Sequence, residues 1–323
     1  MNDLEYTYAV ARIRALESSL FSGTEIERLL ACSDEEQCLQ LLSEKGWGDA
    51  TGSMDASAML KREEEKTWEV IRDVAPDLSV FDVLSYSKLY HNLKAAIKEV
   101  CTEVENKNIF YDDCSIPGPE MLQIVRNKEF HRLPGTMGET AAEAYDTLLH
   151  TRDGQLCDII VDRAALEAIY EAGQKAEDEI IKNYAESTVA IADIKIAVRS
   201  QKTGKSLEFM KRAMAPCSSV NVEQLSKAAV SGLDAVRDYL LGTSYAEGAA
   251  ALEESPSAFE RWCDNRMMET IRPQKYNSFS VGPLVAYVLA RENEIKTVRI
   301  ILTGKQNDFP DEAIRERIRE MYV

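Results

Sequence analysis

The sequence predicts an all-α protein made of three similar helical sub-domains, related by a pseudo-threefold arrangement that forms a funnel. Gly and Pro number only 15 and 9 in 323 residues, which favours helices over tight strand turns. Capping signals mark several helix starts. A short motif recurs at intervals of about one hundred residues. Alternating apolar runs are short, so we expect almost no strand.

The first half of the chain predicts a series of helices with clear start signals. Ser22-Gly23-Thr24-Glu25 is a capping box, in which each end satisfies a free backbone amide, and Ser33-Asp34-Glu35-Glu36 predicts a second one. Gly46-Trp47-Gly48 is expected to end the helix that follows. The predicted helices span Leu4 to Phe21, Ala56 to Val74, Val80 to Glu103 and Glu139 to His150, with an irregular loop from Asn106 to Pro119.

The second half predicts longer helices. An apolar stripe with spacings of three and four residues predicts one helix from Val161 to Arg199, which would be about 58 Å long. Gly204 and Gly304 are interpreted as helix C-caps. The remaining predicted helices span Asn221 to Leu240, Pro256 to Ile271, Pro283 to Leu302 and Pro310 to Tyr322.

Charge and composition exclude several classes of function. The 55 acidic and 38 basic residues give a net charge of −17, which repels nucleic acid and anionic lipid. The start of the chain lacks the basic and apolar regions of a signal peptide, and the longest apolar run, Pro283 to Ala290, is too short to span a bilayer. Seven scattered cysteines without a CxxC spacing indicate thiols in a reducing compartment. We therefore expect a cytosolic protein that reaches a membrane only through a partner.

An internal repeat is the most informative feature of the sequence. Val198-Arg199-x-x-x-Thr203-Gly204-Lys205 recurs as Val298-Arg299-x-x-x-Thr303-Gly304-Lys305, and Asn92 to Lys98 resembles the upstream part of both copies. Each copy has a short polar residue followed six positions later by a cation. On a helix these two positions lie on different faces, so one is expected to support neighbouring segments and the other to face a partner. The candidate residues are Asn92, Lys98, Asp193, Arg199, Asn293 and Arg299.

These copies predict three similar units, with internal repeats near residues 80–105, 181–215 and 282–323 of a single domain that spans residues 1–323. Three units related by rotation can close around a central hole. Chance recurrence of a short motif in a helical chain is the alternative explanation.

Motifs for catalysis, cofactors or metals are not found. Gly204-Lys205-Ser206 resembles the end of a phosphate-binding loop, but position 199 is Arg199 instead of the required Gly. Asp112-Asp113 and Glu63-Glu64-Glu65 are interpreted as a solvated loop and a solvated helix face. Arg12, Arg14 and the other clustered arginines are expected to form ion pairs with carboxylates nearby in sequence. We predict no catalytic residue, no cofactor and no metal site.

Several of these stretches resemble a known family. They are Tyr8-x-x-Ala11-Arg12-Ile13-Arg14-x-x-Glu17, Asn92-Leu93-Lys94, and the closing run from Ala290 to Lys305. They resemble the C subunits of archaeal and bacterial V-type (A-type) ATPases and ATP synthases, which are the counterparts of the eukaryotic V-ATPase d subunits. Thr297 departs from the Asn expected before the final Val-Arg.

The resemblance implies a non-catalytic central-stalk subunit that couples the rotor shaft to the membrane rotor ring during ATP-linked proton or sodium transport. The implied partners are stalk subunits of the D and F type and the ring of proteolipid subunits, with the chain held peripherally at the cytoplasmic face. Two alternatives remain. One is a helical-repeat adaptor unrelated to ATPases, and the other is an all-α enzyme that uses a metal bound by carboxylates such as Asp112 and Asp113.

Overall fold

The computed structural model describes residues 6–49, 55–104 and 109–323, and within them the fold is entirely helical. Sixteen α-helices and three short 3-10 helices occur in these ranges, without a β-strand. The predicted all-α class is therefore confirmed. The predicted first helix begins at Leu4 and the predicted irregular loop at Asn106, two positions that lie outside the described residues.

The chain divides into two compact units. Unit 1 comprises Met1–Leu78, Asp178–Ile180 and Ala250–Val323, and unit 2 comprises Ser79–Glu177 and Ile181–Ala249. The ends of the chain thus belong to one unit and its middle to the other. The funnel of three sub-domains around a single axis stays a prediction.

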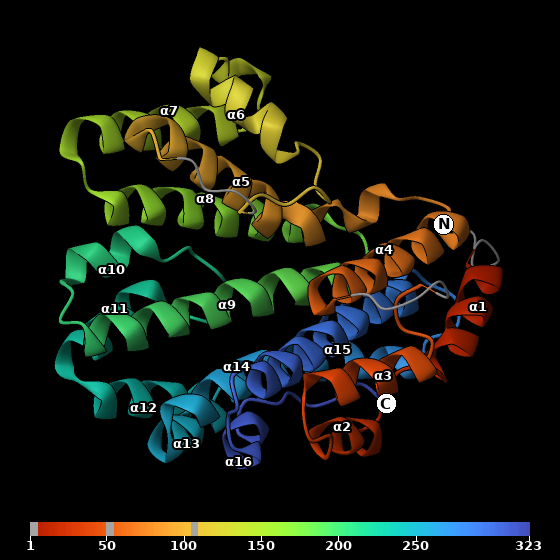
Figure 1. The fold of residues 1–323 in the computed structure, drawn as a ribbon. Helices are drawn as coiled ribbons and strands as arrows, with labels where there is room; N and C mark the ends of the chain where they lie inside the picture. Colours follow the sequence, from red (N-terminus) through yellow and green to blue (C-terminus); the bar gives the residue numbers. More distant parts are fainter. Residues whose placement is uncertain (1–5, 50–54, 105–108) are drawn as a thin grey trace. The chain divides into compact units, whose positions relative to one another are not determined.

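Unit 1 is built around one long helix, α15 (Gly282–Gln306). This helix packs against the N-terminal helices and against the helices on either side of it in sequence (Figure 1). Most of its side chains are buried, because neighbours cover it on several sides. The other helices of unit 1 are α1 (Thr7–Glu17), α2 (Gly23–Leu30), α3 (Glu35–Glu44), α4 (Ala56–Val74), α14 (Pro256–Ile271), η3 (Arg272–Tyr276) and α16 (Asp311–Arg315), with α13 (Glu247–Glu254) leading into it.

Unit 2 contains a layered helical core and a following helical segment. Helix α8 packs against both α5 and α7 (Figure 1). Buried apolar side chains of these helices form a common core. Helices α10, α11 and α12 then pack in sequence order. The helices of unit 2 are η1 (Ser79–Phe81), α5 (Asp82–Thr102), α6 (Gly118–Asn127), η2 (Phe130–Arg132), α7 (Met137–Thr151), α8 (Gly154–Lys175), α9 (Glu179–Lys202, in unit 2 from Ile181), α10 (Leu207–Ala213), α11 (Val222–Ser231) and α12 (Leu233–Leu241).

Local sequence signals set several helix boundaries as expected. Helices α4 and α14 have the predicted bounds, and α2 begins with the predicted capping box of Ser22 and Glu25. The second box is shifted by one residue. Asp34 caps α3 by accepting a hydrogen bond from the Gln37 amide, while the Gln37 side chain accepts from the Ser33 amide. The backbone amides of Ser33 and Gln37 at the start of α3 therefore both have a hydrogen-bond acceptor.

The predicted single helix from Val161 to Arg199 is wrong, because the chain breaks between α8 and α9. The break begins at Ala176, whose backbone is extended. A Cβ built on Gly173 would lie 2.3 Å from the Cβ of Ala185, so these two small residues let α8 and α9 approach closely. The continuous apolar stripe belongs to a helical hairpin, which periodicity alone does not distinguish from one long helix.

Three further expectations for the second half need correction. The predicted helix from Asn221 to Leu240 is divided at Gly232, whose φ of 133° is incompatible with a helix. Gly304 is not a C-cap, since α15 continues to Gln306 and the missing side chain makes room for Ile314. The predicted helix from Pro310 ends early, at Arg315. The Glu320 amide donates to Asn265 instead of continuing a helix. Gly204, by contrast, ends α9 with a positive φ, as predicted.

Candidate functional site

The polar residues of the internal repeat lie inside the molecule. Asn92 on α5 is fully buried and binds the loop that precedes α6. Its Nδ2 donates to the carbonyl oxygens of Tyr111, at 2.8 Å, and Ile116, at 3.2 Å, and its Oδ1 accepts from the Tyr111 amide at 2.8 Å. One side chain therefore satisfies three backbone groups of an otherwise irregular segment.

The polar residues of the other two copies also bind backbone groups. Asn293 on α15 donates from Nδ2 to the Glu320 carbonyl oxygen at 2.8 Å, and Asp193 on α9 accepts from the Ala215 amide at 3.1 Å. In each copy a backbone partner lies 19 to 27 residues further along the chain. We call Asn92, Asp193 and Asn293 the backbone clamps. Their burial turns them toward their own unit and away from solvent.

The cations of the repeat lie at the surface, as their position on another helix face requires. Lys98 pairs with Asp158 at 2.6 Å and Arg299 with Glu64 at 3.3 Å, and Arg199 is exposed. Ion pairs at exposed positions add little stability, so these cations are not needed to hold the fold. The partner of Arg299 is remote in sequence, whereas the sequence predicts a nearby carboxylate. The three cations stay candidates for contact with a partner.

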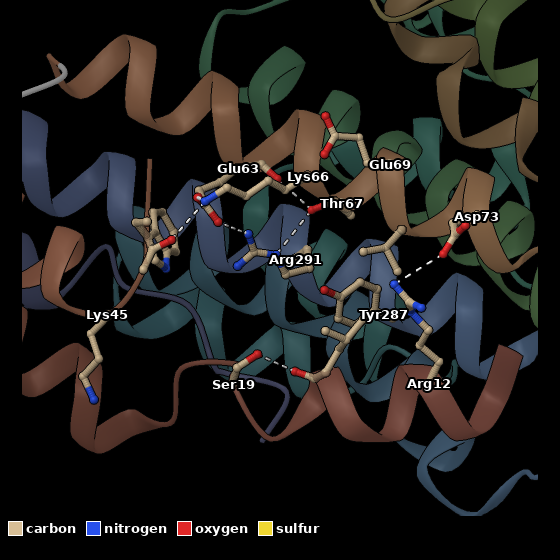
Figure 2. A pocket seen from close by; sticks show the side chains of 14 residues that line it. Arg12, Ser19, Lys45, Glu63, Lys66, Thr67, Glu69, Asp73, Tyr287 and Arg291 are labelled. Carbon is tan, nitrogen blue, oxygen red and sulfur yellow. Dashed lines mark hydrogen bonds and ion pairs between the residues drawn. The ribbon is translucent and has the colours of Figure 1, made fainter. Parts of the chain in front are cut away.

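Unit 1 has an open cleft of about 500 Å³ between α1, α4, α15 and the turn after α3. Figure 2 shows Arg291 at its centre, beside Glu63 and Thr67, while Arg12 and Asp73 pair toward one end. Its lining combines charged side chains of both signs with apolar ones such as Leu16, Trp47 and Val70.

A buried ionic cluster forms the floor of this cleft. The Arg291 guanidinium binds Glu63 at 2.5 Å, also binds Glu294, and lies 5.3 Å from the centre of the Trp47 ring. Glu294 in turn accepts from the Phe21 amide at 2.5 Å. The cluster joins α4 and α15 to the start of the α2 region through charged hydrogen bonds, which are stronger than neutral ones.

Each charge of the cluster is compensated. Glu63 also accepts from the Gly48 amide at 2.9 Å and from Lys66 at 2.7 Å. Burial lowers the pKa of Arg291, but the carboxylates of Glu294 and Glu63 outweigh it and the pKa is raised. Burial raises the pKa of Glu294, and the Arg291 charge opposes this change. Arg291 therefore stays protonated and holds the cluster together.

The interpretation of Glu63 as part of a solvated helix face is wrong, since only 4% of it is exposed. Its neighbours Glu64 and Glu65 are the more exposed members of the run. Arg291 lies 228 positions further along the chain, so no local pattern indicates the pairing. Two features of the sequence are consistent with burial of this cluster. Glu63 and Thr67 are four residues apart, which places them on one helix face, and α15 has charged residues inside an apolar run.

A second surface feature of unit 1 is the segment Arg272–Gly282, which we call the aromatic loop. Tyr276 and Phe279 project from it with 89% and 58% of their surfaces exposed. Arg14 holds the loop from α1, because its Nη2 donates to the carbonyl oxygens of Gln274 at 2.5 Å and Asn277 at 2.8 Å. The backbone that presents the two rings is therefore fixed in advance.

Neither a metal cluster nor a membrane-spanning helix occurs in the described part of the chain. Within residues 6–49, 55–104 and 109–323, no group of three or more His, Cys, Asp or Glu side chains is placed to hold a metal ion. In the same ranges no helix combines the length and the apolar character that crossing a bilayer requires. Asp113, one of the two carboxylates considered for a metal, pairs with Lys88.

Comparisons with known proteins give a consistent result. The chain is 22% identical over 319 residues to the C subunit of the V-type sodium ATPase of Enterococcus hirae, covering 94% of this chain and 97% of that protein. It is 24% identical to the C subunit of the A-type ATP synthase of Methanocaldococcus jannaschii, with 96% and 85% covered, and 25% identical to that of Haloferax volcanii, with 96% of each covered. The family model described as ATP synthase (C/AC39) subunit matches residues 9–317. Because this match spans nearly the whole chain, the protein belongs to the ATP synthase (C/AC39) subunit family.

Proposed function

We propose that the chain is the non-catalytic central-stalk subunit of a rotary V/A-type ATPase, where it couples the rotor shaft to the membrane rotor ring. Its proposed partners are stalk subunits of the D and F type on one side and the proteolipid ring on the other. The complex would hold it at the cytoplasmic face of the membrane and would transport protons or sodium ions.

The observation that carries this proposal is the end-to-end match to C subunits of such complexes. The alignment covers 94% of the chain and 97% of the Enterococcus hirae protein, so the similarity extends over nearly the full length of both. A subunit that transmits torque needs a stiff body and broad contact surfaces. The buried ionic cluster and the backbone clamps support this role. They hold segments of each unit together, and close-packed interiors deform little under load.

We propose the aromatic loop as one contact surface for a partner subunit. Exposed Tyr and Phe side chains on a fixed backbone are typical of residues that dominate interfaces, since little entropy is lost when they bind. No carboxylate occurs between Glu269 and Glu292, although the chain as a whole has 55 acidic residues. The loop is therefore the part of unit 1 best suited to an apolar pocket with acidic residues at its rim.

Binding to purified partners tests the proposal. We expect the intact chain to form a complex with the D and F type stalk subunits and, separately, with the solubilised rotor ring, as measured by size-exclusion chromatography. Failure to bind either one would overturn the proposed coupling role.

The loop is tested within the same experiment by the double variant Tyr276→Ser/Phe279→Ser. We expect it to weaken binding to one partner by at least tenfold, because losing an aromatic hot spot costs about 2 kcal/mol or more. Leu241→Ser, at another exposed apolar position, is the matched control. If wild type binds both partners and the double variant binds equally well, the loop is not a contact while the coupling role still stands.

Family membership leaves the idea of an adaptor unrelated to ATPases without support. The enzyme alternative predicts activity that depends on Asp112 and Asp113. We expect Asp112→Asn/Asp113→Asn to leave partner binding unchanged, and a loss of any chemical activity in this variant would favour the enzyme.

A further inference from the structure

One backbone clamp differs from the other two in its chemistry. Asn92 and Asn293 are amides, which are neutral at every physiological pH, whereas the equivalent position of the middle copy is Asp193. The substitution keeps the shape of the side chain but replaces a donor with a titratable oxygen. The middle clamp is therefore the one that can change its charge.

Asp193 is completely buried. Its Oδ1 accepts one hydrogen bond, from the Ala215 amide at 3.1 Å, and its Oδ2 has no hydrogen-bond partner among the described residues. Ala213, Met214 and Ala215, which lead from the end of α10 into the connection to α11, are also buried. An ionised carboxylate in this position would lack most of the hydrogen bonds that a buried charge requires.

The charged groups around Asp193 do not compensate it. Arg163 on α8 attracts the carboxylate, but its Nη1 donates to the Lys211 carbonyl oxygen at 3.1 Å and its Nε binds Glu167 at 2.8 Å. The thiol of Cys217 also faces this region, and burial raises its pKa to about 11. Neither group supplies a direct hydrogen bond to Oδ2.

We propose that Asp193 is a pH-sensitive clamp, which holds the α10–α11 connection of unit 2 as a neutral acid and loosens it on ionisation. A neutral acid is the nearest mimic of the Asn found in the other two copies. Once ionised, the carboxylate is stabilised by water, which can reach it only if the buried segment from Ala213 to Ala215 moves away from α9. Unit 2 is then the part of the protein that responds to alkaline conditions.

The direction of the effect follows from proton binding. Burial raises the pKa of Asp193 from 3.8 to about 8, so between these values the folded state holds a proton that the unfolded state has lost. Stability from this group therefore falls as pH rises from about 4 to about 8 and is constant above that. One proton corresponds to a tenfold change in the unfolding equilibrium constant per pH unit.

The test compares wild type with Asp193→Asn in urea unfolding between pH 5 and pH 9. We expect the variant to fold, because Asn occupies the equivalent position in two copies. Its advantage over wild type should grow about tenfold in equilibrium constant per pH unit and level off near pH 8. Asp162→Asn, which removes an exposed carboxylate that pairs with Lys94, is the control and should leave the pH dependence unchanged.

An infrared measurement provides an independent readout. Wild type should show a protonated-carboxyl band at pH 6 that disappears near pH 8 and is missing in Asp193→Asn. Parallel stability curves for wild type and Asp193→Asn, or a wild-type spectrum without this band at pH 6, would overturn the proposal.

Discussion

Two sites, one in each unit, stabilise buried acidic side chains in opposite ways. In unit 1, Glu63 and Glu294 share the Arg291 guanidinium and accept backbone hydrogen bonds, so each charge has a partner. In unit 2, Asp193 has one backbone hydrogen bond and no direct cation. A buried acid can be stabilised by a paired cation or by keeping its proton. A site of the first kind is sensitive to loss of the cation, and a site of the second kind is sensitive to pH.

The largest effect should come from removing the cation of the buried ionic cluster in unit 1. Arg291→Ala leaves Glu294 buried without its cation and Glu63 with Lys66 alone, and we expect a loss of about 3–5 kcal/mol in the free energy of unfolding. Urea denaturation at neutral pH measures it.

Arg299→Ala is the control, because its exposed pair with Glu64 contributes at most about 1 kcal/mol. Equal losses in the two variants would mean that the buried cluster contributes no more than a surface ion pair.

A smaller effect should follow from placing a buried, unpaired acid like Asp193 at the equivalent position of unit 1. Asn293→Asp removes the donor that binds the Glu320 carbonyl oxygen and places another acid beside Glu294 on α15. We expect a loss of about 1–3 kcal/mol from the unsatisfied group, increasing as pH rises. Unfolding curves at pH 5 and pH 8 measure it, and a loss that is the same at both pH values would contradict the comparison.

Effects of similar or smaller size concern packing. A Cβ at Gly173 would lie 2.3 Å from the Ala185 Cβ on a neighbouring helix, whereas a Cβ at Gly304 would meet side-chain atoms of Ile314, of which Cδ1 and Cγ1 are nearest at 2.6 Å. We expect Gly173→Ala to cost about 1–3 kcal/mol and Gly304→Ala less, since side-chain atoms beyond Cβ can shift more readily than a Cβ fixed to its backbone. Thermal unfolding ranks the two. Gly154→Ala, where space is open, is the control, and the reverse ranking would contradict this view of the α8–α9 contact.

Much of this fold was predictable because helix starts are encoded locally. The caps of α2 and α3, the Pro at the start of α14 and the bounds of α4 depend on residues within one turn of each other. Helix breaks were harder to predict. The break after Ala176 and the early end of α16 depend on tertiary contacts, such as Gly173 with Ala185 and Asn293 with the Glu320 carbonyl.

The candidate sites follow the same division. The repeat placed its polar residues and its cations on different helix faces, because helix periodicity fixes which faces they occupy, but it did not indicate which of the two would be buried. It did not predict the ionic cluster, since Glu63 and Arg291 are 228 positions apart and neither belongs to a motif. Nor did it predict that Arg14 would support the aromatic loop, which lies 260 positions away.

Ion uptake into vesicles measures whether the chain couples ATP hydrolysis to ion transport. Complexes reconstituted with and without this chain would be compared for ATP hydrolysis and for ATP-driven ion uptake. We predict that without the chain hydrolysis continues while uptake is lost, and that adding the purified chain restores uptake. Uptake that is equally fast without the chain would contradict the proposed coupling role.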